Sequence, residues 1–378
     1  MRFSEVRHQE RALSIIRRAL RSGRTHHAYL FEGPEGVGKE LAAVALAARF
    51  LCAEETLAAD DDACGACTDC RLLANGNHPD FHLIHRGLHK VHPERTVRSG
   101  KGLFLVVDLI RHFLIEPSAM KPAQGRRRVF LVRDAERMNE GAQNALLKTL
   151  EEPPGSACLI LVTSSSMRLL PTIRSRCQRI PFDLLPPAFV ESELSAGGGL
   201  SEDAVRALSR LADGRLGVAL RWQDIGLLDS LDGLGACLDG LPSGDPESFG
   251  KTLLEIGGEL AGRAQESGEA SSGNSGKSGA KTIPTDELRA ALKLALMLLA
   301  ALYRDGLVVK AGADGLHALP QQRRRVEGLA AACSMDDLDA CLRAIHDAER
   351  MLDRNVAPQL VGERLAVTLL GEERALRA

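Results

Sequence analysis

Residues 28–40 read AYLFEGPEGVGKE, and this stretch decides the fold of the first half of the chain. Its first four residues form an uninterrupted apolar run, which is typical of a short buried strand. A glycine-rich turn that fits the pattern G-x-x-x-x-G-K follows, and a helix with an Ala/Leu/Val stripe is predicted from Glu40 to about Phe50. Backbone amides in such a turn, the start of the helix and the lysine together bind nucleotide phosphates. The predicted phosphate-binding residues are Gly33, Gly36, Gly38 and Lys39.

Two more apolar runs, 129–132 and 159–162, predict further buried strands. Between them, residues 144–152 place three leucines on one helical face, and Pro153-Pro154 ends that helix because proline lacks an amide donor. Buried strands that alternate with helices indicate an α/β fold, in which a parallel sheet is covered on both faces.

The pattern changes after Phe182, where no strand-like run remains. Pro186-Pro187 marks a boundary, residues 201–221 predict short amphipathic helices, and the pattern is helical from Asp224 to the end. Residues 265–281 are rich in Gly and Ser without apolar periodicity, which predicts a flexible loop or linker.

Composition excludes several classes of function. The formal net charge is −2 over 378 residues and aromatics make up 3%, so neither whole-molecule charge nor base stacking favours nucleic-acid binding by the chain itself. The arginine runs 126–128 and 323–325 are expected to be solvated faces. No run of about 18 apolar residues predicts a membrane span, and the polar first ten residues lack a secretory signal, so we expect a cytoplasmic protein without membrane contact.

The residues around the phosphate loop depart from those of an active ATPase. The position after Lys39 normally carries Ser or Thr as a magnesium ligand, but here it is Glu40. P-loop ATPases also hold magnesium with an Asp at the end of a second strand, where this chain has Arg133. The first interpretation is a weak or empty nucleotide site, and the second is a working loop with an unusual helix cap. If both side chains face the magnesium position, they could form an ion pair that fills it.

Four of the nine cysteines crowd into residues 52–70 and predict a structural zinc site. The short spacings turn the sulfurs towards one centre, and four protein ligands leave no open position for catalysis. His78 and His82 are rival ligands, and four free thiols are the remaining alternative. The predicted ligands are Cys52, Cys64, Cys67 and Cys70.

Four motifs in order carry a resemblance to a known family: HHAYLF (26–31), GNHPD (76–80), NALLKTLEEPP (144–154) and SRC (175–177). Over residues 5–222 the chain resembles the clamp-loader subunits of bacterial DNA polymerase III, which are AAA+ proteins. The resemblance implies a RecA-like AAA+ P-loop domain over 1–182 with an inserted zinc module at about 50–80. It also implies a small helical lid over 183–225 and an all-α oligomerisation collar over 226–378.

The resemblance also implies roles for single residues. Arg176 would be an arginine finger that reaches the γ-phosphate of a neighbouring subunit, a contact worth on the order of a thousandfold in rate. Asp134 lies at the position of the water-activating Glu, Thr163 at the first sensor, and Gly217 replaces the arginine of the second sensor. Arg215 lies on a different helical face from that position and would not substitute.

These departures point to the delta-prime type, which in this family usually does not hydrolyse ATP. Zinc would be structural, and ATP or ADP would bind weakly or not at all. The implied partners are the gamma/tau and delta subunits, with the sliding clamp and primed DNA in the complex. The alternatives are an active gamma/tau-like ATPase, a zinc-dependent nucleic-acid-binding repair protein and, more remotely, a P-loop kinase.

Overall fold

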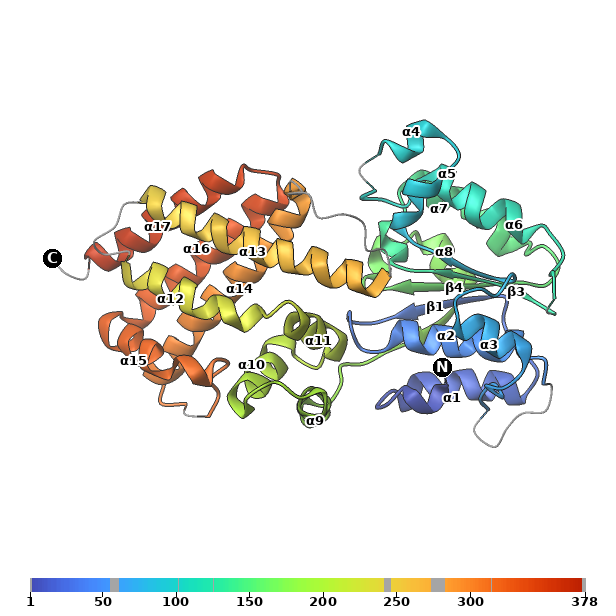
Figure 1. Cartoon of the computed structure of the whole chain (residues 1–378), viewed down its shortest axis with the longest axis horizontal. Helices are drawn as coiled ribbons and strands as arrows, with labels where there is room; N and C mark the ends of the chain where they lie inside the picture. Colours follow the sequence, from blue (N-terminus) through green and yellow to red (C-terminus); the bar gives the residue numbers. More distant parts are fainter. Residues whose placement is uncertain are drawn as a thin grey trace. The chain divides into compact units, whose positions relative to one another are not determined.

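The computed structural model describes residues 2–54, 61–100, 102–124, 126–240, 246–272, 283–313 and 315–375 (Figure 1). The chain divides into two compact units, Met1–Pro186 and Pro187–Ala378. The division falls within Pro186-Pro187, as the sequence predicts.

A five-stranded parallel sheet forms the centre of the first unit. Its strands are β1 (Ala28–Glu32), β2 (Phe81–Ile84), β3 (Arg128–Val132), β4 (Ala157–Thr163) and β5 (Gln178–Pro181). They are arranged in the order β2-β3-β4-β1-β5. Every residue of β3 and β4 is buried, because helices cover both faces of a sheet whose strands read as continuous apolar runs. The three predicted strands are thereby confirmed.

The other two strands were missed because their sequences look unlike buried strands. β2 reads FHLI and β5 reads QRIP, so each has four residues and at least one polar or charged side chain. Both are edge strands of the sheet, where one side of the strand has no neighbour and polar residues are tolerated. Their parallel pairing to β3 and β1 is a long-range contact that no local pattern reports.

Helices lie on both faces of this sheet (Figure 1). One face carries α1 (Glu10–Arg21), α2 (Lys39–Leu51) and α3 (Thr68–Ala74). The other carries α5 (Val107–Ile110), which continues through a π-helical turn into α6 (Glu116–Ser118), and α7 (Glu140–Glu151). The predicted leucine face of α7 is in the core, since Leu146 and Leu150 are buried and Leu147 packs against the same cluster. The short helices α4 (Arg95–Arg98) and α8 (Pro171–Arg176) also belong to this unit.

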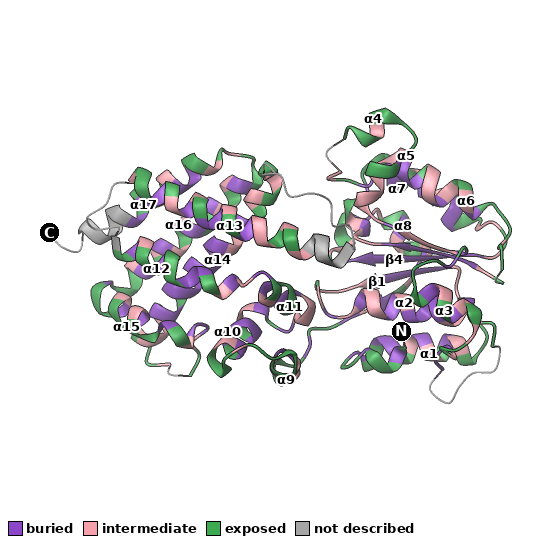
Figure 2. Ribbon diagram, viewed as in Figure 1, coloured by how far each residue is buried: buried purple, intermediate pink, exposed green. Residues whose placement is uncertain are grey.

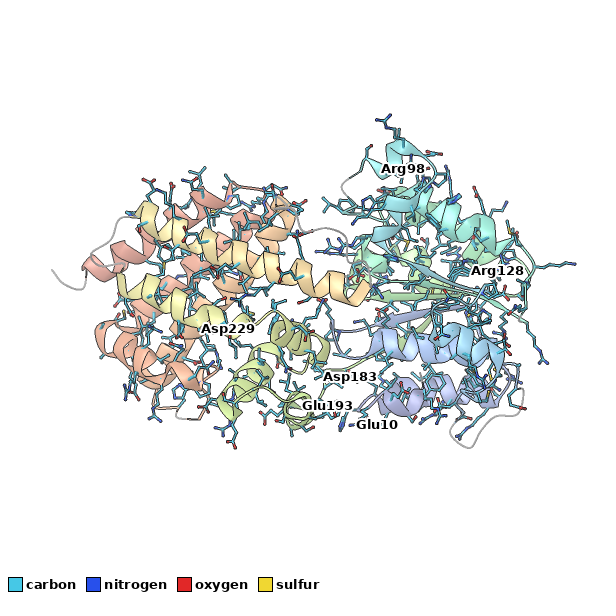
Figure 3. The ribbon with its side chains drawn as sticks, viewed as in Figure 1. Glu10, Arg98, Arg128, Asp183, Glu193 and Asp229 are labelled. Carbon is cyan, nitrogen blue, oxygen red and sulfur yellow. The ribbon has the colours of Figure 1, made fainter. Side chains whose placement is uncertain are left out.

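The prediction that the arginine run 126–128 is a solvated face is wrong for Arg128. Arg128, labelled in Figure 3, begins β3 and is buried. Its guanidinium donates to the carbonyls of Pro117 and Lys121 at 2.9 and 3.0 Å. The same guanidinium contacts the fully buried Asp80 at 3.5 Å. A buried arginine needs such partners, because desolvation of an unpaired charge is costly.

Helices are the only regular secondary structure in the described residues of the second unit (Figure 2). The α-helices are α9 (Pro187–Gly197), α10 (Glu202–Ala212), α11 (Leu216–Asp224), α12 (Ser230–Gly240), α13 (Pro246–Ser272), α14 (Thr285–Lys310), α15 (Arg323–Ala332), α16 (Met335–Asp353) and α17 (Pro358–Ala375). Within these described ranges of the whole chain, no helix has the length and apolar character needed to cross a bilayer. The division of this unit into lid and collar at residue 225 stays a prediction.

The prediction of a Gly/Ser-rich linker over residues 265–281 placed its start too early in the chain. Helix α13 continues to Ser272, so residues 265–272 are helical, and residues 273–281 lie outside the described residues. The low apolar content of the last two turns of α13 hid them from a periodicity argument. The long partner helix α14 includes the predicted amphipathic stretch 288–302.

Candidate functional site

The glycine-rich turn lies where β1 meets α2, at the carboxyl edge of the sheet. Gly33 and Gly38 have φ values of +149° and +98°, which only glycine adopts without strain. A Cβ atom at Gly33 would also lie 2.2 Å from the carbonyl oxygen of Phe182. The turn therefore needs glycine at these two positions for local backbone reasons.

Lys39 begins α2 and turns back into this loop. Its Nζ donates to the carbonyl oxygens of Gly33, at 2.7 Å, and of Pro34. Burial lowers the pKa of Lys39 to about 8, although the carboxylates of Glu136, Glu35 and Asp134 oppose that shift. The ammonium group is thus held by two carbonyl oxygens of the loop.

Glu40 and Arg133 form the ion pair that the sequence suggested. Glu40 lies in the first turn of α2 and Arg133 follows β3, and the Nη2 atom of Arg133 donates to Oε1 of Glu40. Each side chain is 41% exposed, so the pair is partly solvated. Because exposed ion pairs contribute about 0–1 kcal/mol, its direct effect on stability is small. The two opposite charges nevertheless neutralise each other at this edge of the sheet.

Asp134 follows Arg133 at the same edge with φ +52°, and Arg86 approaches its carboxylate at 4.0 Å. Burial raises the pKa of Asp134, and the nearby carboxylate of Glu136 raises it further. Both effects disfavour the charged form of this carboxyl group.

Glu136 is a member of this cluster that the sequence argument missed. Its Oε1 accepts hydrogen bonds from the amide of Ser164, at 3.2 Å, and from the Ser164 hydroxyl. Burial acts to raise the pKa of Glu136, but hydrogen bonds from Ser164 and Thr163 outweigh burial and lower it. Thr163 is buried at the end of β4, and its Oγ1 accepts from the amide of Ser165 at 3.1 Å. Glu136 follows two residues after Asp134, a spacing that carries no recognisable motif.

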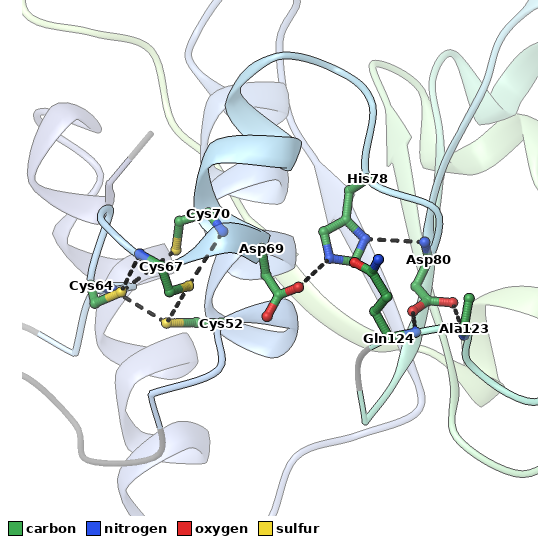
Figure 4. A network of polar contacts seen from close by, with 9 residues as sticks. All are labelled: Cys52, Cys64, Cys67, Asp69, Cys70, His78, Asp80, Ala123 and Gln124. Atoms are coloured by element: carbon green, nitrogen blue, oxygen red, sulfur yellow. Dashed lines mark hydrogen bonds and ion pairs between the residues drawn. The ribbon is translucent and has the colours of Figure 1, made fainter.

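The four predicted cysteine ligands come together between α2 and α3 (Figure 4). Their sulfur atoms all lie within 4.8 Å of one another, with 4.0 Å between Cys52 and Cys67 and 3.9 Å between Cys64 and Cys70. Four sulfurs placed ~2.3 Å from a tetrahedral zinc ion would be separated by about 3.8 Å. The cluster therefore fits a metal ion such as zinc.

Backbone amides support this arrangement of sulfurs. The amides of Cys64, Cys67 and Cys70 donate to the sulfurs of Cys52, Cys64 and Cys67 at 3.5, 3.3 and 3.4 Å. Hydrogen bonds from the backbone of Ala66 and Cys67 lower the pKa of the Cys64 thiol to about 6. A low thiol pKa favours the thiolate form that binds metal.

The rival histidines have other partners. Nε2 of His78 lies 3.3 Å from the carboxylate of Asp69 on α3, and its Nδ1 accepts the amide proton of Asp80 at 3.0 Å (Figure 4). His82 stacks on the ring of Phe130 at 4.8 Å. Through its contacts with Asp69 and Asp80, His78 connects α3 to the segment before β2. The carboxylate of Asp80 in turn accepts the amides of Ala123 and Gln124 at 2.7 and 2.9 Å.

Arg176 is the last residue of α8, where the chain turns into β5. Its side chain is 34% exposed and contacts Glu151, the last residue of α7, at 2.5 Å. The other two predicted positions, Gly217 and Arg215, lie in the second unit. Gly217 is in the first turn of α11, and the guanidinium of Arg215 donates to the carbonyls of Ala212 and Leu211 at 2.7 and 3.4 Å.

The chain is similar to subunits of bacterial DNA polymerase III. A family model described as "DNA polymerase III, delta subunit" matches residues 8–186. The DNA polymerase III subunit delta' of Pseudomonas aeruginosa is 40% identical over 187 residues, which are 49% of this chain and 51% of that protein. Its counterpart in Bacillus subtilis is 35% identical over 186 residues, with the same shares. The match thus spans about half the length of these delta' relatives.

A second kind of relative matches over more of the chain. The DNA polymerase III subunit gamma/tau of Mycobacterium tuberculosis is 31% identical over 405 aligned residues, which cover 95% of this chain and 66% of that protein. Among solved structures, a DNA polymerase III gamma subunit-related protein of Thermotoga maritima covers 96% of this chain and 100% of its own. Its TM-score is 0.42 and its sequence identity is 17%.

Proposed function

The chain belongs to the clamp-loader subunit family of bacterial DNA polymerase III, and we propose that within this family it is a delta-prime-type subunit. Such a subunit hydrolyses ATP weakly or not at all. It donates Arg176 to the ATP site of a neighbouring gamma/tau subunit, and so helps to load the sliding clamp on primed DNA.

The ion pair between Glu40 and Arg133 is the observation that carries this proposal. Both residues replace magnesium ligands of an active P-loop ATPase, and their contact leaves a neutral, partly solvated pair at that position. The Lys39 ammonium, held by loop carbonyls, adds to the same interpretation. ATP or ADP would therefore bind weakly, because neither the metal nor the terminal phosphates would find their usual partners.

Arg176 is suited to act across an interface. It ends α8 within the SRC motif, and one third of its side chain is exposed to solvent. An arginine supplied in trans stabilises the charge that develops on the transferred phosphoryl group. Thr163, Asp134 and the loop glycines would then be inherited positions of a site that no longer turns over.

The four-cysteine cluster is proposed to bind one structural zinc ion. Cys52, Cys64, Cys67 and Cys70 would fill its four positions, so the ion would contribute to folding and would not react with substrate. The proposed partners are the gamma/tau and delta subunits, with the sliding clamp and primed DNA in the assembly. The proposed location is the cytoplasm.

A gamma/tau-like ATPase is the second candidate, because a gamma/tau relative matches over 95% of this chain. The two candidates differ in one measurable property. Replacement of Lys39 by Ala in the assembled loader would lower ATPase turnover if this chain were an active motor. The same replacement leaves turnover unchanged if its own nucleotide site is silent.

The test of the proposal is single-turnover ATP hydrolysis by a loader assembled from this chain with gamma/tau, delta, clamp and primed DNA. Arg176→Ala should slow hydrolysis at the neighbouring site by about a thousandfold, with assembly intact. Arg174→Ala is the matched control, because Arg174 lies on the same helix and contacts the sulfur of Met167 at 3.2 Å. A single-turnover rate of ATP hydrolysis that is unchanged in Arg176→Ala would refute the role of Arg176 as an arginine finger.

A further inference from the structure

The contacts of Arg176 within its own chain define a resting position for this side chain. Its Nη2 atom lies 2.5 Å from Oε1 of Glu151, and its Nη1 atom donates to the carbonyl oxygen of Thr172 at 3.0 Å. Thr172 is one turn earlier on α8, so the guanidinium folds back along its own helix. In this position the arginine is not extended into solvent.

A buried side chain fixes the two helices that carry this pair. Gln143 on α7 is 5% exposed, and its Oε1 accepts the amide of Leu170 just before α8 at 2.8 Å. Its Nε2 donates to the carbonyls of Met138 and Arg168 at 2.9 and 3.3 Å. The end of α7 is held as well, because Nε2 of His27 is 2.9 Å from the carbonyl oxygen of Leu150. The distance between the backbones at Glu151 and Arg176 is therefore set by packing, and only the side chains are free to change partner.

The ion pair itself is easy to break. The Arg176 and Glu151 side chains are 34% and 48% exposed, so water and salt compete with the contact. Partly exposed pairs of this kind are weak. A triphosphate carries several negative charges and offers bidentate acceptors, so it would outcompete one carboxylate for the guanidinium.

We propose that Glu151 is a restraining residue, which holds Arg176 in a resting position until a phosphate of the neighbouring subunit takes its place. This inference rests on the proposed finger role of Arg176. Glu151 touches no reacting atom in this scheme. It neutralises the guanidinium before the subunits engage, and the finger becomes available only when the pair exchanges one anionic partner for another.

The size of the effect follows from a two-state population. A weak pair leaves the extended arginine as the minor state, and loss of the restraint raises its population by about two- to fivefold. Because the pair is partly solvated, added salt should screen it and shrink this advantage. Salt dependence separates an electrostatic restraint from a purely structural role, which salt would leave unchanged.

The test compares Glu151→Gln with Glu152→Gln in the assembled loader. Glu152 is the next residue and is exposed, and within the described part of the chain its side chain has no hydrogen bond or ion pair. The readout is the clamp- and DNA-stimulated ATPase rate at low and at high salt, with Arg176→Ala measured in parallel. Glutamine keeps the shape and an acceptor oxygen but removes the charge.

We expect Glu151→Gln to raise the stimulated ATPase rate at low salt by about two- to fivefold over the wild type. That ratio should fall towards one at high salt, and Glu152→Gln should stay at one throughout. A ratio of one at low salt, or a lower rate in Glu151→Gln with assembly intact, would overturn the inference. If Arg176→Ala still slows hydrolysis in that case, the proposed finger survives. If Arg176→Ala has no effect, both proposals fail together.

Discussion

The most direct test of the nucleotide site gives positions 40 and 133 the two magnesium ligands of an active P-loop ATPase. The double variant Glu40→Thr/Arg133→Asp replaces the observed ion pair by the hydroxyl and carboxylate that a P-loop ATPase uses. If the pair is what closes the nucleotide site, the double variant should bind nucleotide in a magnesium-dependent way. Each single variant should gain less, because Glu40→Thr leaves the Arg133 cation at the metal position and Arg133→Asp leaves the Glu40 carboxylate to repel the phosphates.

The magnitudes follow from the exposure of the pair and from Coulomb's law. Both side chains are 41% exposed, so a double-mutant cycle on unfolding should give a coupling of about 0–1 kcal/mol. A unit charge ~4 Å from another contributes about 4 kcal/mol at an effective dielectric constant near 20. Part of this Coulomb energy is absent in the wild type, because the opposite charges of Glu40 and Arg133 offset each other. A net gain of at least ~1.4 kcal/mol, or about tenfold in nucleotide affinity, is therefore expected for the double variant with magnesium.

The assay is calorimetric titration of the isolated chain with ADP and a non-hydrolysable ATP analogue, with and without magnesium, alongside urea unfolding. Affinity in the double variant that rises about tenfold only with magnesium supports the argument. Tight magnesium-dependent binding by the wild type would refute it, because the ion pair would then coexist with a working site. A coupling above about 2 kcal/mol on unfolding would also refute it, since the pair would be a structural contact.

Three further predictions concern stability. Chelation of metal or the variant Cys64→Ser should lower Tm and expose the N-terminal segment to protease, because the loop beside the cysteines accepts the amide of Phe3 through Asp62; proteolysis that is unchanged by chelation would contradict this. The depressed pKa of Lys39 means that the unfolded chain binds more protons between about pH 8 and the ordinary lysine value, so the free energy of unfolding should rise with pH there. That rise should be smaller in Lys39→Met, measured by urea unfolding at each pH. Asp80→Ala should lower the free energy of unfolding by about 3–5 kcal/mol, because it leaves the Arg128 guanidinium buried without its carboxylate; a loss under 1 kcal/mol would show that this charge finds another partner.

The sequence predicts those parts of the fold that repeat a local physical pattern. The apolar runs at 28–31, 129–132 and 159–162 became β1, β3 and β4, because strands buried on both faces must be apolar throughout. The Glu40–Arg133 contact was also predictable. Two motif positions that share one metal ion in an active enzyme must lie close together, whichever side chains occupy them.

Other features depend on contacts between distant segments, which no local pattern encodes. The edge strand β2 is defined by its pairing with β3, and Arg128 is buried because Asp80, which lies just before β2, approaches its guanidinium. Likewise, the carboxylate of Glu136 is held at the carboxyl edge of the sheet by a hydrogen bond from the amide of Ser164, which follows β4. The restraint on Arg176 was equally hidden, since Glu151 lies 25 residues away in the sequence and on another helix.

Retention of the glycine-rich loop is not evidence for nucleotide binding by this chain. Gly33 is required by its φ of +149° and by the Phe182 carbonyl, which leaves no room for a Cβ atom whether or not a phosphate is present. Lys39, in turn, has acceptors of its own in the carbonyls of the loop. A chain that lost its nucleotide could therefore keep both features for packing reasons alone. The positions that discriminate between an active and a silent subunit are those without such a second role, and at these positions, 40 and 133, the chain carries a mutually neutralising pair.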